Sequence, residues 1–100
     1  MTLHTWKEVV HVYRERSSGR EDSVEREMTF NLNLPEASNR PDGRFYGSFE
    51  WYDAGCEYYS EGGLWFDASQ TLVDYDGCFS LCSQLKDKIV ELGWNLPASC

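Results

Sequence analysis

Residues 24–34, VEREMTFNLNL, carry the clearest structural signal in the chain. Apolar side chains fall on the even positions and polar ones on the odd positions, with Arg26 as the exception near the start. A period of two places one face of a strand in a core and the other in solvent, which is typical of antiparallel sheets. This stretch therefore predicts a strand in an antiparallel sheet that has one open face.

Segments on both sides of this stretch predict further strands. Two of these segments are rich in β-branched and aromatic residues, which favour strands. Short turns separate the remaining segments from one another. We expect a glycine pair, Gly62–Gly63, to end one short strand before the next begins. The expected additional strands cover residues 5–14, 44–53, 56–60, 64–66 and 71–75. The sheet should therefore have five or six strands.

A change of period near residue 78 predicts a helix. Apolar residues then recur at spacings of three and four: Cys78, Leu81, Cys82, Leu85, Ile89 and Leu92. This pattern is typical of an amphipathic helix, here from about residue 81 to 92, with Ser80 as its N-cap. Gly93 suits the left-handed position after a helix, and Trp94 can then fold back on Ile89.

Strands followed by one helix predict an α+β fold in a single domain of residues 1–100. The C-terminal helix should pack on one face of the antiparallel sheet. The uncovered face should then display carboxylates and tyrosines together, namely Glu25, Glu27, Tyr46, Glu50 and Tyr52. A register change of one residue would reverse this assignment, because side chains alternate between the faces.

The charge of the chain is acidic and unevenly distributed. Nine Lys and Arg residues stand against seventeen Asp and Glu residues, for a net charge of −8. Residues 45–85 contain no Lys or Arg, although they hold seven carboxylates and eleven of the fifteen aromatic residues. A segment so rich in aromatic rings should be ordered, so the negative charge should lie on a rigid surface.

This composition argues against several classes of partner. Binding to DNA or RNA requires Lys and Arg gathered on one face, and an anionic membrane would attract the same residues. No apolar run approaches the roughly 20 residues that span a bilayer. The first residues show no signal-peptide pattern, so we expect a cytoplasmic protein.

The sequence predicts neither a cofactor nor a metal. The four cysteines are Cys56, Cys78, Cys82 and Cys100, and they lack zinc-site spacing. Free thiols are expected rather than disulfides, since no signal peptide precedes the chain. The segment from Asp74 to Gly77 resembles part of a calcium loop, but the later glutamate ligand is missing. We interpret this segment as a turn between a strand and the helix.

No catalytic motif is present, and we do not expect an enzyme. His4 and His11 should point to opposite faces of one strand, without a nucleophile beside either. Carboxylate pairs such as Glu57 and Glu61 could act in acid–base chemistry only if burial separated their pKa values.

The acidic set favours a surface that binds a basic protein or ribonucleoprotein complex, because aromatic anchors within a charged rim are typical of interfaces. Solubility alone is the alternative, since a net charge of about 2–8 is ordinary for a small domain. The candidate contact residues are the acidic and tyrosine side chains Glu25, Glu27, Tyr46, Glu50, Tyr52, Asp53, Glu57, Tyr59, Glu61, Asp67, Asp74 and Asp76.

In its size, its cation-free aromatic stretch at residues 45–85 and its sheet-plus-helix pattern, the chain resembles the small acidic α+β anti-CRISPR proteins of phages. The resemblance implies an inhibitor that binds a CRISPR effector complex in the bacterial cytoplasm and blocks recognition of target DNA, by steric occlusion or as a DNA mimic. Bacterial immunity proteins against basic nuclease toxins are similar in the same features. A non-inhibitory adaptor module is a further alternative.

Overall fold

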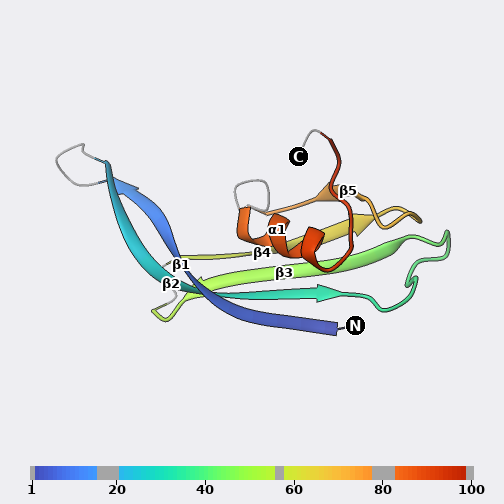
Figure 1. Cartoon of the computed structure of the whole chain (residues 1–100), viewed down its shortest axis with the longest axis horizontal. Helices are drawn as coiled ribbons and strands as arrows, with labels where there is room; N and C mark the ends of the chain where they lie inside the picture. The colour runs from blue at the N-terminus through green and yellow to red at the C-terminus, as the bar shows by residue number, and fades with distance from the viewer. Residues whose placement is uncertain (1, 16–20, 56–57, 78–82, 99–100) are drawn as a thin grey trace.

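The computed structural model describes residues 2–15, 21–55, 58–77 and 83–98, which form one five-stranded antiparallel sheet and one helix. The strands lie in chain order, from β1 at one edge to β5 at the other (Figure 1). The elements are β1 (Thr2–Glu15), β2 (Glu21–Leu34), β3 (Phe45–Asp53), β4 (Tyr59–Phe66), β5 (Leu72–Tyr75) and α1 (Ser83–Glu91). The predicted α+β fold is confirmed.

The strand count is five because β4 runs through Gly62 and Gly63, which we had expected to divide it. Glycine fits at these two positions because atoms of other residues occupy the space that a side chain would fill. A Cβ on Gly62 would meet the backbone and carboxylate of Asp76 and the ring of Phe49. The prediction of separate strands at residues 56–60 and 64–66 was therefore wrong.

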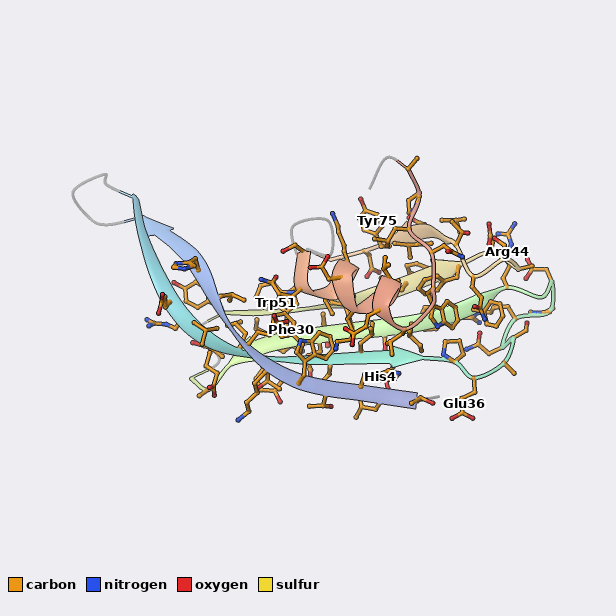
Figure 2. The ribbon with its side chains drawn as sticks, in the orientation of Figure 1. His4, Phe30, Glu36, Arg44, Trp51 and Tyr75 are labelled. Carbon is orange, nitrogen blue, oxygen red and sulfur yellow. The ribbon has the colours of Figure 1, made fainter. Side chains whose placement is uncertain are left out.

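One face of the sheet carries the core, and α1 lies across that face (Figure 1). The even positions of β2 from Met28 to Leu34 are buried there, as the alternating pattern predicts. Phe30 and Trp51 are register partners on β2 and β3, and both lie on the helix side of the sheet (Figure 2). The buried residues are Met28, Phe30, Leu32, Leu34, Phe49, Leu64, Phe66, Leu72, Leu85, Ile89 and Trp94.

The end of α1 follows the predicted cap. Gly93 has a φ of 88° and donates its N–H to the carbonyl of Val90, while Trp94 donates to the carbonyl of Ile89 at 3.0 Å. This pair of bonds satisfies two carbonyls of the last helical turn. The ring of Trp94 then packs edge-on against Phe45 and Phe66, so the cap also positions a large core side chain.

Some predictions fall outside the described residues. They concern the start of the helix at residues 81–82, its N-cap Ser80 and all four cysteines. Within residues 2–15, 21–55, 58–77 and 83–98, no helix has the length and apolar character needed to cross a bilayer.

The pairing of β2 with β3 confirms the predicted open face. Thr29 lies opposite Tyr52, Asn31 opposite Glu50, and Asn33 opposite Ser48. Paired residues project to the same side of a sheet, and the core occupies the other side. Glu25, Glu27, Tyr46, Glu50 and Tyr52 therefore share the face away from α1, which we call the open face.

The β1–β2 hairpin extends well beyond the rest of the sheet. Its strands pair over fourteen residues, whereas β2 pairs with β3 only from Met28 to Asn33. The outer part of the hairpin therefore curves away as a two-stranded arm (Figure 1). This arm gives the molecule its elongated extents of 52 × 26 × 20 Å.

Candidate functional site: the open face of the sheet

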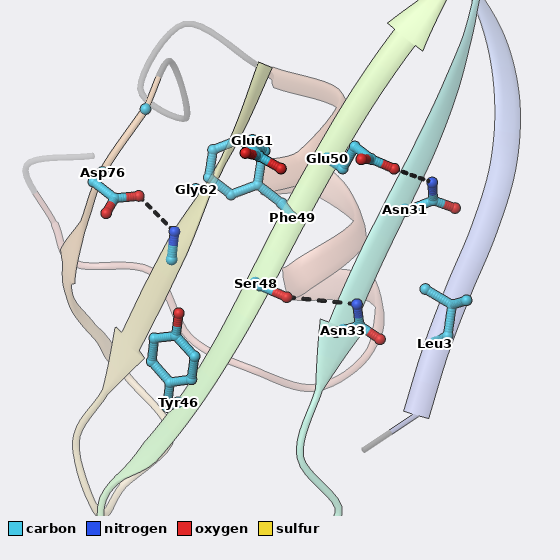
Figure 3. Close-up of a pocket in the computed structure, with 12 residues that line it drawn as sticks. Leu3, Asn31, Asn33, Tyr46, Ser48, Phe49, Glu50, Glu61, Gly62 and Asp76 are labelled. Carbon is cyan, nitrogen blue, oxygen red and sulfur yellow. Dashed lines mark hydrogen bonds between the residues drawn. The ribbon is translucent and has the colours of Figure 1, made fainter. Parts of the chain in front are cut away.

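The open face contains a shallow hollow of about 850 Å³ (Figure 3), which we call the central hollow. Its floor consists of small, uncharged groups on the three middle strands: Asn31, Asn33, Ser48 and Gly63. Larger side chains surround this floor, including Leu3, Tyr46, Glu50, Glu61 and Asp76. The hollow is therefore a polar depression with carboxylates on its border.

Hydrogen bonds connect side chains across four strands of the open face. Thr5 donates to the amide oxygen of Asn31 at 2.8 Å, and Asn31 donates to Glu50 at 2.9 Å (Figure 3). The hydroxyl of Tyr59 lies 3.2 Å from the other oxygen of Glu50 and 2.7 Å from Glu61. Glu50 is therefore held in place from both sides.

Glu50 and Glu61 lie directly opposite each other on β3 and β4. Like charges in this arrangement repel. Tyr59 is within hydrogen-bonding distance of both carboxylates but has one proton to donate. The hydrogen bond to Glu61, followed by loss of hydration and the negative charge of Glu61 and Glu50, raises the pKa of Tyr59 far above its ordinary value. The open face thus keeps two adjacent charges that its own donors satisfy only in part.

Asp76 joins the end of β5 to β4. Its Oδ1 accepts a hydrogen bond from the backbone N–H of Gly63 (Figure 3), and its own N–H donates to the carbonyl of Gly63 at 3.2 Å. Gly77 follows with a φ of 68°, and a Cβ there would meet the carbonyl of Glu61. The carboxylate of Asp76 is therefore fixed at the border of the hollow.

Aromatic side chains occupy the end of the open face near residues 36–44. Tyr46 contacts Trp65 edge to face, with ring centroids 5.3 Å apart. The backbone of Tyr46 exchanges two hydrogen bonds with the side chain of Asn39, and the guanidinium of Arg40 lies 4.8 Å from its ring centroid. Arg40 thus occupies one face of an aromatic pair beside the acidic groups.

The structure brings most of the predicted contact residues together. Glu25, Glu27, Tyr46, Glu50, Tyr52, Tyr59, Glu61 and Asp74 share the open face, and Asp76 borders its hollow. Glu25 and Glu27 lie on the hairpin arm, where His11 at 3.6 Å and Lys7 at 3.9 Å are near them. Among the described carboxylates of the open face, those on β3, β4 and β5 have no such basic side chain beside them.

Asp53 does not belong to this surface, which corrects the prediction. It pairs with Met28 on the core side, has 7% of its surface exposed, and accepts the N–H of Tyr58 at 3.2 Å. Its odd position in β3 is the reason, because Phe49 and Trp51 point to the same side. The alternation of the strand was sufficient to place it there.

Asp67 also has a local role. It lies in the turn between β4 and β5, where it accepts hydrogen bonds from the hydroxyl and N–H of Ser69 and the N–H of Thr71. These bonds lower the pKa of Asp67, with the Ser69 hydroxyl as the largest cause. Asp67 therefore organises this turn. Of the other predicted contact residues, Glu57 lies outside the described residues.

The residues on the floor of the hollow were not among the predicted contact residues. Asn31 and Asn33 share the odd positions of β2 with Glu25 and Glu27, so the same alternation could have identified them. Trp65 could be assigned to the open face only from the register of β3 and β4. The sequence alone predicts that its strand begins after the glycine pair.

Among the residues that the structure describes, no group of three or more His, Cys, Asp or Glu side chains is placed to hold a metal ion. Comparison with protein-family models, with curated proteins and with solved structures finds no match to this chain.

Proposed function

We propose that the protein is a stoichiometric inhibitor that binds a basic nucleic-acid-handling complex through the open face of its sheet. The observation that carries the proposal is the set of carboxylates on β3, β4 and β5, in a region of the chain without Lys or Arg. The proposed target is a CRISPR effector complex in the bacterial cytoplasm, and the proposed effect is loss of target DNA recognition.

Rigidity of the charged groups supports this proposal. Glu50 is fixed by Asn31 and Tyr59, and Asp76 is fixed by the backbone of Gly63. Preorganised side chains lose little conformational entropy when a partner binds. The site therefore suits tight binding better than a flexible acidic tail of equal charge would.

The distribution of charge supports a cationic partner. Complementary potentials accelerate encounter and disfavour partners of like charge. A groove that binds a nucleic acid is lined with Lys and Arg, and carboxylates on a sheet can occupy the positions of phosphates there. The interaction should consequently weaken as salt increases.

The aromatic residues supply the contacts that slow dissociation. Tyr46, Tyr52, Tyr59 and Trp65 lie among the carboxylates on the same face. Tyr, Trp and Arg contribute most of the energy at protein interfaces, and charged groups at the border contribute mainly to rate and specificity. The open face contains both the aromatic residues and the charged groups.

The test measures binding to purified CRISPR effector complexes and inhibition of their binding to target DNA. The informative variant is Glu50→Lys with Glu61→Lys, which reverses two adjacent charges on the open face. We expect it to lose at least about tenfold in affinity, because interfacial charge pairs contribute roughly 1.5 kcal/mol or more each.

The matched control is Asp87→Lys with Glu91→Lys on α1. It changes the net charge by the same amount, but at exposed positions on the other side of the sheet. Equal loss in both variants would mean that only net charge matters and would contradict the proposed site. Failure to bind any effector, together with neutralisation of a basic nuclease, would assign the protein to the immunity class instead.

A further inference from the structure

The two edges of the sheet differ in how they are protected. The β5 edge is four residues long, has an irregular register with β4, and is partly covered by the chain after α1. There, Leu72 donates to the carbonyl of Asn95, and Asn95 donates to the carbonyl of Gln70, both at 2.9 Å. Short length, a bulge and a covering segment are known means of preventing strand addition.

The β1 edge has none of these three features. It is fourteen residues long, contains neither Gly nor Pro, and pairs with β2 without a register shift. No strand that the structure describes pairs with its outer side. A long, regular edge of this kind presents unpaired N–H and C=O groups to another strand.

We propose that β1 pairs antiparallel with β1 of a second copy of this chain, around a two-fold axis through Trp6. Isologous pairing of this kind is the commonest form of oligomer symmetry. Side chains that face each other in an antiparallel pair project to the same side of the sheet. The axis must therefore pass through a residue rather than between two residues, which limits the register to a few choices.

The exposed apolar residues of β1 select Trp6 as the centre. Leu3 and Val9 project from the open face, with 57% and 61% of their surfaces exposed. Each is three positions from Trp6. An axis through Trp6 therefore places Leu3 of each copy opposite Val9 of the other copy. The two symmetry-related Leu3–Val9 pairs are then covered by the same strand pairing.

The charged residues agree with the same register. Lys7 then faces Thr5 of the second copy, and Glu8 faces His4 of the second copy on the helix side. Centring the pair on Lys7 would instead oppose two lysines, and centring it on Glu8 would oppose two glutamates. Like charges directly opposite each other destabilise a strand pair.

The resulting dimer is one continuous sheet in which both helices lie on the same side. The open faces of the two copies then form a single surface. Its interface is a strand pair with few buried side chains, and small interfaces of this kind give weak complexes. We therefore expect a dimer that dissociates on dilution.

Sedimentation velocity of the full chain over a wide range of concentration tests this inference. We expect a monomer–dimer equilibrium in the native protein. Leu3→Lys and Val9→Glu should each weaken the dimer at least about tenfold, since each buries a charge against an apolar side chain. The double variant should regain dimerisation, because the new lysine and glutamate then face each other across the axis.

Val90→Glu is the control, because Val90 is 56% exposed on α1 and the substitution is of the same kind. Circular dichroism of every variant establishes that the fold is retained. A chain that stays monomeric at all concentrations, or single variants that dimerise normally, would overturn the proposal. A double variant without rescue would show that Trp6 is not the centre and would overturn it as well.

The outcome is separable from the proposed inhibitory function. A monomeric protein that still binds and inhibits an effector complex would remove the dimer and leave the inhibitor intact. A dimer that binds no basic partner would do the reverse.

Discussion

At the level of single residues, Tyr59 links two carboxylates of the open face. Its hydroxyl lies between Glu61 at 2.7 Å and Glu50 at 3.2 Å. Ionisation of the phenol would place a third negative charge beside two carboxylates. The hydrogen bond that the hydroxyl donates to Glu61, followed by loss of hydration and this charge repulsion, holds the pKa of Tyr59 far above the ordinary value of 10.0.

Because the pKa of Tyr59 is raised, we expect Tyr59 to contribute no phenolate absorbance in an alkaline titration of the native protein. We expect the phenolate absorbance of the native protein up to a pH of about 11 to be the same in the wild type and in Tyr59→Phe. In denaturant, the wild type should exceed the variant by the absorbance of one tyrosine out of six. A smaller native signal in the variant would mean that Tyr59 ionises in this range.

The same pKa shift sets the sign of a stability change. Because the folded pKa is raised, the stabilisation from Tyr59 is fully present below the unfolded value of 10.0 and is lost as the pH rises toward the folded value. Tyr59→Phe should therefore show a smaller loss of stability than the wild type above pH 10.0.

At the level of elements, β4 depends on two consecutive glycines. Gly62 allows Phe49 and Asp76 to approach its backbone, and Gly63 allows Trp65 and Tyr46 to approach on the other face. Glycine normally weakens a strand, but here it permits close packing between strands. Both β3 and β5 can therefore approach β4 closely at the two glycines.

We predict that Gly62→Ala destabilises the protein by about 1–3 kcal/mol, the usual cost of forcing extra volume into a packed site. The new Cβ would meet the carbonyl and carboxylate of Asp76. Denaturant unfolding measures the change, and Gly55→Ala is the control because nothing lies within 4 Å of its Cβ position. Similar stability in both variants would show that β4 tolerates a side chain there.

At the level of the whole molecule, a net charge of −8 opposes folding through self-repulsion. Glu50 and Glu61 face each other, and no Lys or Arg lies between residues 45 and 85. Salt screens such interactions between exposed charges over roughly 10 Å at 0.1 M ionic strength.

We therefore expect sodium chloride to raise the melting temperature while it weakens binding to a basic partner. The stabilisation should be modest, about 1 kcal/mol or less, as is usual for exposed charges. Glu50→Gln with Glu61→Gln should reduce the gain, because it removes the closest repulsion on the open face. Thermal unfolding at several salt concentrations below about 0.5 M provides the measurement. A melting temperature that falls with salt would contradict this account.

The local pattern of the sequence was sufficient for the fold class and for most of the open face. Alternation along residues 24–34 and 44–53 placed Glu27, Tyr46 and Glu50 on one side, and the register confirmed it. Gly93 was identified as the helix cap because a left-handed residue strongly favours glycine. These features depend on neighbours in the chain, and the sequence contains those neighbours.

Contacts between distant segments decided the rest. The sequence interprets Gly62 and Gly63 as a break, but β4 runs through both. Asp76 and Phe49 occupy the space beside Gly62, and Trp65 and Tyr46 occupy the space beside Gly63. The pairing of Glu50 with Glu61 through Tyr59 follows from the register of β3 and β4, which composition does not determine. By its pattern of residues, the sequence determined which side chains are buried and which are charged. The partner of each side chain was decided only by tertiary structure, because packing between strands selects one register among several that the same alternation allows.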